Sequence, residues 1–353
     1  MSTPKKSAHP LHRIPLEKWQ ALYDLAFRLW DMAPWEQMEE TEIFGIQPAA
    51  SPEPWFVSVM GAIGEFRAIT FYDGMEGLRL FWQIQTTPGN SLRDSGQVLN
   101  TPQLMAAFGE AGDIFPEEKK LLKQIGYAPR GKRGWPYFRS YRAGYAPWIL
   151  EPAEADCLLT YLTKALEFLP QYLADPGLLP PTAPGADVLV LVEKADGWAR
   201  QLVKPTIPLV RYDFKLPMAV IHQVRDIPRT THTFELGLWP LPMYTGEKNE
   251  RPQIPYMLLL TDRESSFILG AQLLSVNDDG GWPGMMAKIP DHLMETLLKH
   301  KVRPTRIHVS TPWLEKLLDP PGRATDVYVE YREDMSAQMA VLGELLNSPP
   351  FQQ

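Results

Sequence analysis

Apolar residues near the start of the chain recur at helical spacing. The pattern predicts a helix that begins at Pro15 and ends before Pro34, because Leu16, Trp19, Leu22, Ala26, Leu29 and Trp30 recur at steps of three and four residues. The segments "EIFGIQP", "PWFVSVMG" and "FRAITFY" then predict short strands. Gly61 and Gly64 supply the turn between the last two strands, so we expect a hairpin there.

Helical and strand patterns continue to residue 172. Asp73 and Glu76 have the spacing of a capping box and predict a helix over "YDGMEGLRLFWQI". The segment "TTPGNSLRDSGQ" is expected to be a loop, and "PEEKKLLKQIG" a short helix with Pro116 in its first turn. The strand "WPYFRSY" and a long helix from about Pro152 to Tyr172 complete this half.

The second half starts with strand patterns at "DVLVLVEK", "ARQLVKP", "MAVIHQVRDI" and "THTFELGLW". A hairpin of "YMLLLTD" and "FILGAQLLS" follows, and helices then alternate with the strands "TRIHVS" and "DVYVEY". A hairpin followed by this alternation is the element order of ribonuclease H-like domains, the fold of integrases and transposases. We therefore predict an α+β fold whose C-terminal part is compatible with a ribonuclease H-like mixed sheet, although fold analogy alone assigns no function.

A segment rich in proline and glycine, "ADPGLLPPTAPGAD", predicts the domain boundary. We expect a flexible tail over residues 1–13, an N-terminal α+β domain over 14–174, a linker over 175–186 and a C-terminal α+β domain over 187–347. Two domains agree with a length of 353 residues.

Composition narrows the class of protein. The net charge of -7 argues against a chain-wide polyanion binder, although it allows a local basic patch. Cys157 is the only cysteine, so an internal disulfide and a thiolate zinc site are excluded, and we expect an inert, half-buried thiol. Without an apolar secretory region or an 18-residue apolar run, we expect a cytoplasmic protein that does not engage a membrane.

Few residues indicate catalysis. None of the seven histidines stands in an HExxH pattern, and no serine stands in G-x-S-x-G. We therefore expect no metal site, no cofactor and no enzyme activity. The catalytic candidate is Asp262, because in nucleases of the ribonuclease H-like fold the first strand carries a magnesium-binding carboxylate. Three observations favour other interpretations. The later strand "TRIHVS" ends in Ser310 instead of a carboxylate, and Glu295 on the intervening helix fits a solvated helix residue. Asp262 itself is equally suited to begin a turn.

The segment "APRGKRGWPYFRSYRAGYAPW" mixes basic and aromatic residues. Basic side chains neutralise phosphates and rings stack on unpaired bases, so this composition suits single-stranded nucleic acid. The candidate ligand-binding residues are Arg130, Lys132, Arg133, Trp135, Arg139 and Arg142. Strand alternation places rings on both faces, so a partly buried strand with arginines paired to acids is the alternative, and a homodimer contact is a third.

Several motifs together suggest a family. The stretches "LWDMAPWEQMEETEIFGI", "FVSVMGAIGEFRAITFYDGMEGL" and "RGWPYFRSYRAGYAPWILEPAEADCLL" resemble the N-terminal domain of a group of uncharacterised bacterial proteins. The stretch "RPTRIHVSTPWLEKLL" resembles the second domain that often follows it, also of unknown function. The resemblance covers most of the chain and implies a cytosolic protein of two α+β domains, with no reaction attached.

The function expected from the sequence is a non-enzymatic, cytosolic binding or regulatory protein with a protein or nucleic-acid partner. The alternative is a metal-dependent nuclease or transposase-like enzyme with a degenerate ribonuclease H-like site centred on Asp262.

Overall fold

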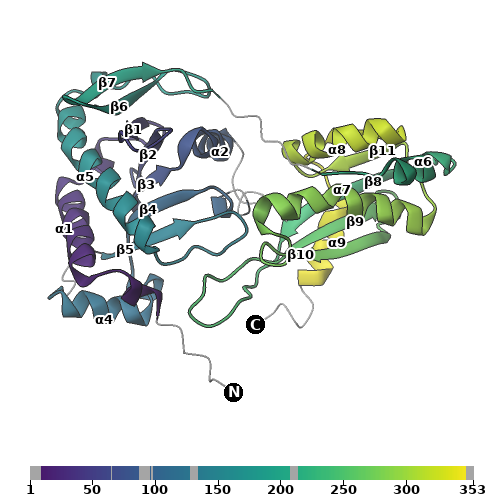
Figure 1. Cartoon of the computed structure of the whole chain (residues 1–353), viewed down its shortest axis with the longest axis horizontal. Coiled ribbons are helices and arrows are strands. Elements are labelled where there is room, and N and C mark those ends of the chain that lie inside the picture. Colours follow the sequence, from purple (N-terminus) through teal and green to yellow (C-terminus); the bar gives the residue numbers. More distant parts are fainter. Residues whose placement is uncertain are drawn as a thin grey trace. The chain divides into compact units, whose positions relative to one another are not determined.

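The computed structural model describes residues 9–64, 66–86, 96, 98–127, 134–206 and 214–346. The chain forms two compact units. One comprises Met1–Pro208 and Glu247–Arg251, and the other comprises Leu209–Gly246 and Pro252–Gln353. Each unit is built on one mixed sheet with helices, which confirms the predicted two-domain α+β fold (Figure 1).

The first unit contains a seven-stranded sheet with the order β5-β4-β3-β2-β1-β6-β7. Its strands are β1 (Phe44–Gln47), β2 (Trp55–Met60), β3 (Arg67–Tyr72), β4 (Gln103–Gly109), β5 (Trp135–Tyr141), β6 (Val188–Lys194) and β7 (Gly197–Val203). Only β1 and β6 run parallel, and the other neighbours are antiparallel. Gly61 and Gly64 both have positive φ, so they form the predicted turn between β2 and β3.

The position of β6 corrects the predicted domain boundary. Strands β6 and β7 were assigned to the second domain, but β6 pairs with β1 and extends the first sheet. The first unit therefore continues to Pro208, and the segment 175–186 connects two parts of that unit. A parallel pairing across more than a hundred residues leaves no local signal in the sequence, whereas prolines and glycines mark a loop whether or not a domain ends there.

Helices cover both faces of the first sheet. Helices α1 (Leu16–Met32) and α5 (Pro152–Ala174) lie together on one face, and α2 (Gly74–Thr86) lies on the other (Figure 1). Strand alternation explains this arrangement, because Val57 and Val59 pack in the core under α1 and α5 while Phe56 packs with Leu78 and Phe81 of α2. Helix α4 (Pro116–Gln124) precedes β5.

The second unit contains a five-stranded sheet with the order β10-β9-β8-β11-β12. Its strands are β8 (Thr233–Pro240), β9 (Tyr256–Asp262), β10 (Ile268–Leu274), β11 (Arg306–Val309) and β12 (Tyr328–Tyr331). Strands β8, β9 and β10 form an antiparallel meander, while β11 runs parallel to both β8 and β12. The mixed sheet expected for this half is therefore present, and the strand at its centre is β8.

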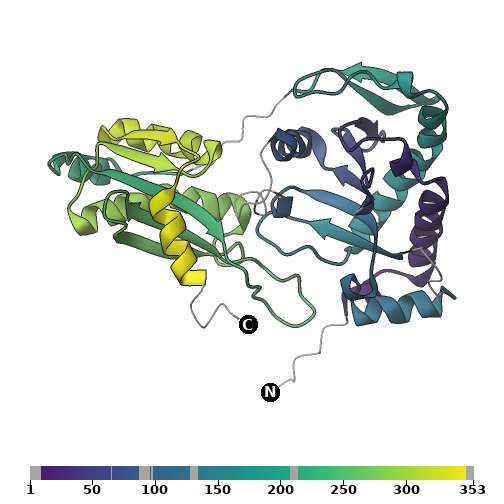
Figure 2. The same ribbon diagram turned by 180° about the vertical axis from the view of Figure 1, so that it is seen from behind.

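The helices of the second unit are α6 (Met218–Asp226), α7 (Gly281–His300), α8 (Pro312–Thr325) and α9 (Ser336–Leu346). Helix α6 packs against α7 and α8, and α9 packs against β8 and β9. Figure 2 shows α9, in yellow, crossing the sheet on the face opposite the other three helices. The segment "MAVIHQVRDI" was predicted to be a strand but forms α6, because the i, i+4 pair Val220 and Val224 favours a helix here over β-branched propensity.

Candidate functional site

The aromatic and basic segment gives rise to β5, which has the predicted bounds. Arg130, Lys132 and Arg133 lie outside the described residues. Both faces of the strand are packed, since Phe138 belongs to the core under α1 and α5 while Tyr137 belongs to a second cluster with Ile114. Trp135 is half-buried, and the ammonium of Lys119 lies 6.0 Å from the centre of its ring.

Arg139 forms a buried ion pair with Glu118 of α4. Its Nη1 and Nη2 donate to the two carboxylate oxygens over 2.7 and 3.0 Å, and the two side chains are only 7% and 2% exposed. The same two nitrogens also donate to the carbonyl oxygens of Phe138 and Asp113. A bidentate pair with this many hydrogen bonds offsets much of the cost of removing both charges from water.

Two aromatic rings enclose the Arg139 guanidinium. Its central carbon lies 4.7 Å from the ring centres of both Phe115 and Tyr137, which is a cation–π distance. Burial raises the pKa of Tyr137 to about 12, so its ring stays neutral. A ligand that used Arg139 would have to displace Glu118 and enter between these rings, so the predicted ligand-binding role of Arg139 stays a prediction.

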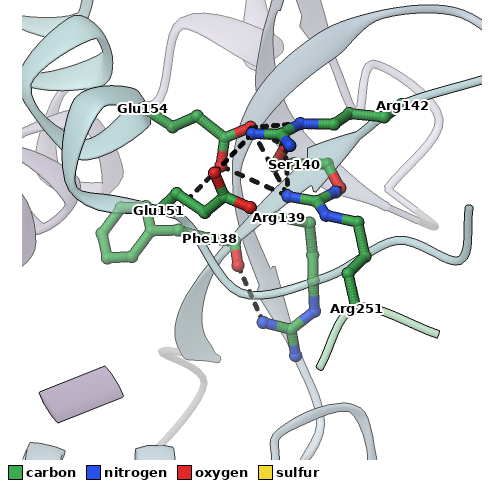
Figure 3. Close-up of polar contacts among 7 residues, drawn as sticks. All are labelled: Phe138, Arg139, Ser140, Arg142, Glu151, Glu154 and Arg251. Carbon is green, nitrogen blue, oxygen red and sulfur yellow. Dashed lines mark hydrogen bonds and ion pairs between the residues drawn. The ribbon is translucent and has the colours of Figure 1, made fainter. Parts of the chain in front are cut away.

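Arg142 lies just after β5 and pairs with the start of α5 (Figure 3). Its guanidinium donates to Glu151 and Glu154 over 2.8 Å each. Glu151 is the N-cap of α5, and its backbone nitrogen donates to Glu154 in a capping box. The hydrogen bonds and charges of these two carboxylates outweigh partial burial and raise the pKa of Arg142 above its ordinary value.

Arg251 completes this cluster from the segment Glu247–Arg251 of the first unit (Figure 3). It donates to the carbonyl oxygen of Ser140 over 2.9 Å, to the Ser140 hydroxyl over 3.0 Å and to Glu154 over 3.3 Å. The Ser140 hydroxyl in turn donates to Glu154. We call Ser140, Arg142, Glu151, Glu154 and Arg251 the β5 cluster; its contacts fix the end of β5 to the start of α5.

Sequence reasoning found Arg139 and Arg142 but missed Glu118 and Arg251. Glu118 and Arg251 are 21 and 111 residues away from the β5 residues that they contact, so spacing could not identify them. Glu151 and Glu154 did carry a signal, since their spacing is that of a capping box.

Cys157 lies on α5 and is half-buried. Burial raises the pKa of its thiol to about 12, and the nearby carboxylates of Asp73 and Glu154 act in the same direction. A thiol with this pKa carries almost no thiolate near neutral pH and is a poor nucleophile.

Asp262 ends β9 and begins the turn to β10. Its Oδ1 accepts hydrogen bonds from the backbone nitrogen and the hydroxyl of Ser265, while its Oδ2 lies 2.7 Å from Nδ1 of His232. Partial burial alone would raise the pKa of Asp262, but the hydrogen bonds from Ser265 and His232 outweigh it and lower the pKa. The carboxylate of Glu264 lies 4.0 Å from the same histidine nitrogen, so a second carboxylate accompanies Asp262.

The central strand of the second sheet carries a different carboxylate. Glu235 lies on β8, the first strand of the meander, and is fully buried. Asp262 lies at the end of β9, so "YMLLLTD" is the second strand of the meander and not the first. Nη1 of Arg263 donates to Glu235 over 2.6 Å, and the backbone nitrogen of Gln338 donates to the other oxygen of this carboxylate. Arg263 also contacts Asp334, two residues before α9.

His308 of β11 lies beside Glu235 in the strand register. Nη1 of Arg263 lies 3.4 Å from its Nδ1, and its Nε2 lies 3.2 Å from Glu330 of β12. A neutral ring fits these contacts, with Nδ1 accepting and Nε2 donating. Burial lowers the pKa of His308; the Glu330 carboxylate opposes this shift, whereas the cations of Arg263 and Arg332 reinforce it. The parallel strand next to β8 therefore presents an imidazole, and not a carboxylate, beside Glu235.

Comparison with known proteins identifies both halves of the chain. Residues 19–189 match the model of a domain of unknown function (DUF7309), and residues 220–346 match the model of another domain of unknown function (DUF6930). No curated protein matches the chain. Among the described residues, no helix has both the length and the apolar character that a bilayer crossing requires.

The second unit, most of which matches the DUF6930 model, has an apolar strand at the edge of its sheet. Within the part of the chain that the structure describes, β10 pairs only with β9, and Phe267, Ile268 and Leu273 are 61%, 45% and 58% exposed. The sequence from Phe267 to Ser275 contains no charged residue. Such a strand is unusual in a soluble domain, because edge strands commonly carry lysine, proline or other features that prevent pairing with another chain.

A cavity of about 210 Å³ lies between this edge strand and α7. Leucines of β8, β9 and β10 line its floor, and Gly270 and Ala271 keep its rim on β10 low. His292, Glu295 and Lys299 of α7 supply polar groups on the other side. Glu295, the helix carboxylate noted in the sequence, belongs to this rim and is mostly exposed beside His292.

Proposed function

We propose that the chain is a non-enzymatic, cytoplasmic binding protein whose DUF6930 domain recognises an extended, uncharged, apolar segment of another protein along β10. The observation that carries this proposal is the exposed apolar edge of β10, with its uncharged sequence and the adjoining cavity. The proposed cytoplasmic location agrees with the single cysteine, because disulfides are rare in the reducing cytoplasm and this chain can form none internally.

Addition of a strand to β10 would use both faces of the sheet edge. Gly270 and Gln272 pair with Leu260 and Leu258, which line the cavity under α7. Ile268 and Leu273 pair with Thr261 and Met257, so they lie on the opposite face. An added strand would place alternate side chains in the cavity and on the exposed apolar side chains, while its main chain bonded to β10.

The two other candidate functions have weaker support. A two-metal nuclease centred on Asp262 needs several carboxylates to hold its magnesium ions. Glu264 is the one carboxylate grouped with Asp262 among the described residues, and Glu235 of the central strand already accepts hydrogen bonds from Arg263 and Gln338. Of the basic residues predicted for a nucleic-acid site, Arg139 and Arg142 are paired with glutamates, and Arg130, Lys132 and Arg133 lie outside the described residues. The protein partner is therefore the function that the geometry supports best.

The test uses a labelled peptide with the sequence of β10 itself, FILGAQLLS, as a defined uncharged strand. We expect saturable binding in fluorescence anisotropy. Leu273→Lys should weaken it at least about tenfold, because a charge on the edge strand opposes strand addition. Leu202→Lys is the matched control, since Leu202 is an equally exposed leucine on β7, the edge strand of the other sheet.

Each outcome bears on the proposal. A concentration-dependent dimer of the chain, abolished by Leu273→Lys, would support strand addition and identify the partner strand as β10 of a second copy. Absence of both peptide binding and dimerisation, or equal effects of the two lysine variants, would overturn the proposal. Binding of a labelled single-stranded oligonucleotide at low salt, weakened by Arg142→Ala, would instead favour the nucleic-acid partner.

A further inference from the structure

We propose that His232, Asp262 and Glu264 form a binding site for one divalent transition-metal ion such as Zn²⁺. One ligand atom from each of the three side chains lies within 4.8 Å of the other two. The site goes beyond the proposed binding function, and it departs from the expectation from sequence that the chain holds no metal. His232 and Asp262 are 30 residues apart, so no ligand spacing was visible in the sequence.

The ligand types fit the ion. Zn²⁺ prefers imidazole nitrogen and carboxylate oxygen in the absence of thiolate, at distances near 2.1 Å. In a tetrahedral site these distances separate the donor atoms by about 3.4 Å. The present separations from Nδ1 of His232 are 2.7 Å to Asp262 and 4.0 Å to Glu264, so adjustments of less than about 1 Å bring these pairs to that value.

Two of the three side chains can move and the third is held in place, which suits a metal site. The side chains of His232 and Glu264 are 54% and 58% exposed, so their rotamers can change at little cost. The Asp262 carboxylate is held in place by Ser265 through its other oxygen, an outer contact of the kind that orients a ligating carboxylate. One ligand is therefore fixed and two can close on the ion.

The charges favour a cation at this point. Two carboxylates approach one imidazole, while Arg263, which lies between the two acids in sequence, directs its guanidinium to Glu235 and Asp334. In the metal-free protein Nδ1 of His232 lies at hydrogen-bonding distance from Oδ2 of Asp262. A bound ion needs the lone pair of Nδ1, so a proton on this nitrogen leaves to solvent or moves to Nε2 when the ion binds. Affinity should therefore fall as the pH is lowered.

Three protein ligands leave one position of a tetrahedral ion for water or for an anionic ligand. The site joins the start of β8 to the turn between β9 and β10. It is distinct from the Glu235 carboxylate, whose oxygens are taken by Arg263 and Gln338.

The experiment is calorimetric titration of the metal-free full chain with ZnCl₂, together with Co²⁺ absorption spectroscopy, which reports the ligand field directly. We expect one ion per chain, at least tenfold weaker binding in His232→Gln and Glu264→Gln, and loss of the Co²⁺ spectrum in both. His292→Gln is the matched control, because His292 pairs with Glu295 on α7 and is no part of the proposed site, so this variant should leave the titration unchanged.

The test does not use Asp262→Asn, because Asp262 also holds the turn at Ser265 and this variant would disturb the turn. Binding that His232→Gln leaves intact, or binding lost equally in His292→Gln, would overturn the site. Absence of any Zn²⁺ or Co²⁺ binding below millimolar concentration would overturn it as well. A circular dichroism spectrum that matches the wild type in both ligand variants would show that their effect is local.

Discussion

Arg139 in the first unit and Arg263 in the second both hold a buried glutamate, but their surroundings differ. Arg139 and Glu118 form a closed, bidentate pair between two rings, and the arginine side chain is almost fully buried. Arg263 reaches Glu235 through one nitrogen and Asp334 through the other, and 28% of its side chain is exposed. It also lies beside a titratable imidazole, His308.

The difference indicates what each pair contributes. A closed pair gives geometry and strength, because its donors have fixed partners and water is excluded. An open pair shared among several charges contributes less to stability, and its strength depends on the protonation of its neighbours. The predictions below test this contrast from the largest expected effect to the smallest.

The largest effect is expected for Glu118→Gln. The substitution leaves the Arg139 charge buried without its partner, so the free energy of unfolding of the first unit should fall by about 3–5 kcal/mol. Urea unfolding followed by tryptophan fluorescence measures this loss. Lys18→Met, which removes an exposed pair with Asp156, is the control and should cost less than about 1 kcal/mol.

A double variant separates the pair from its site. Arg139→Met combined with Glu118→Leu removes both charges and keeps apolar volume, so it should recover most of the stability that Glu118→Gln loses. A Glu118→Gln loss no larger than that of Lys18→Met would show that the Arg139 pair is no stronger than a surface pair, and the contrast between the two arginines would fail.

Much of the fold followed from local pattern. Strand β5, the hairpin of β2 and β3 and helix α5 all formed where apolar spacing placed them. Strand β4 was missed: five of its seven residues, including Ala106 and Ala107, are buried hydrophobics, so the segment lacks the alternation of a half-exposed strand. The pairing of β1 with β6 was also missed, because it depends on distant parts of the chain.

The sites were harder to predict than the strands. The alternative interpretation of "WPYFRSY" as a buried strand already required acids for its arginines, but only the pairing of elements identifies Glu118. Asp262 was singled out as the carboxylate of a first strand, a position that Glu235 of β8 holds. Its neighbour His232 comes from the entry to β8, which only the antiparallel pairing of β8 with β9 brings near. Contacts of this kind depend on register, which the sequence of one strand does not contain.

The β5 cluster allows the same contrast to be tested at a single carboxylate. Arg251 and Arg142 both donate to Glu154, but their side chains are 7% and 43% exposed. We expect Arg251→Met to lower the free energy of unfolding of the first unit by about 1.5–3 kcal/mol, because it removes buried, charge-assisted hydrogen bonds. Arg142→Met should cost less than about 1 kcal/mol. Equal losses in urea unfolding would mean that burial does not decide the strength of these pairs.

The smallest effect concerns pH and the open network of the second unit. Because the pKa of His308 in the folded protein is lowered below 6.5, the unfolded chain binds more protons between these two values. This histidine therefore contributes stability above its ordinary pKa, and that stability is lost as the pH falls through the folded pKa. Glu235 opposes this trend at lower pH. Burial raises the pKa of Glu235, so its contribution to stability is present below its ordinary pKa and is lost as the pH rises through the folded pKa.

His308→Gln should therefore flatten the dependence of stability on pH between about 5 and 7 relative to wild type. Subtracting the free energy of unfolding of His308→Gln from that of the wild type at each pH removes most of the Glu235 contribution, because both proteins contain Glu235. Equal slopes of the unfolding free energy against pH in wild type and His308→Gln would count against the open network. Glu118→Gln is the control and should leave the slope of the second unit unchanged.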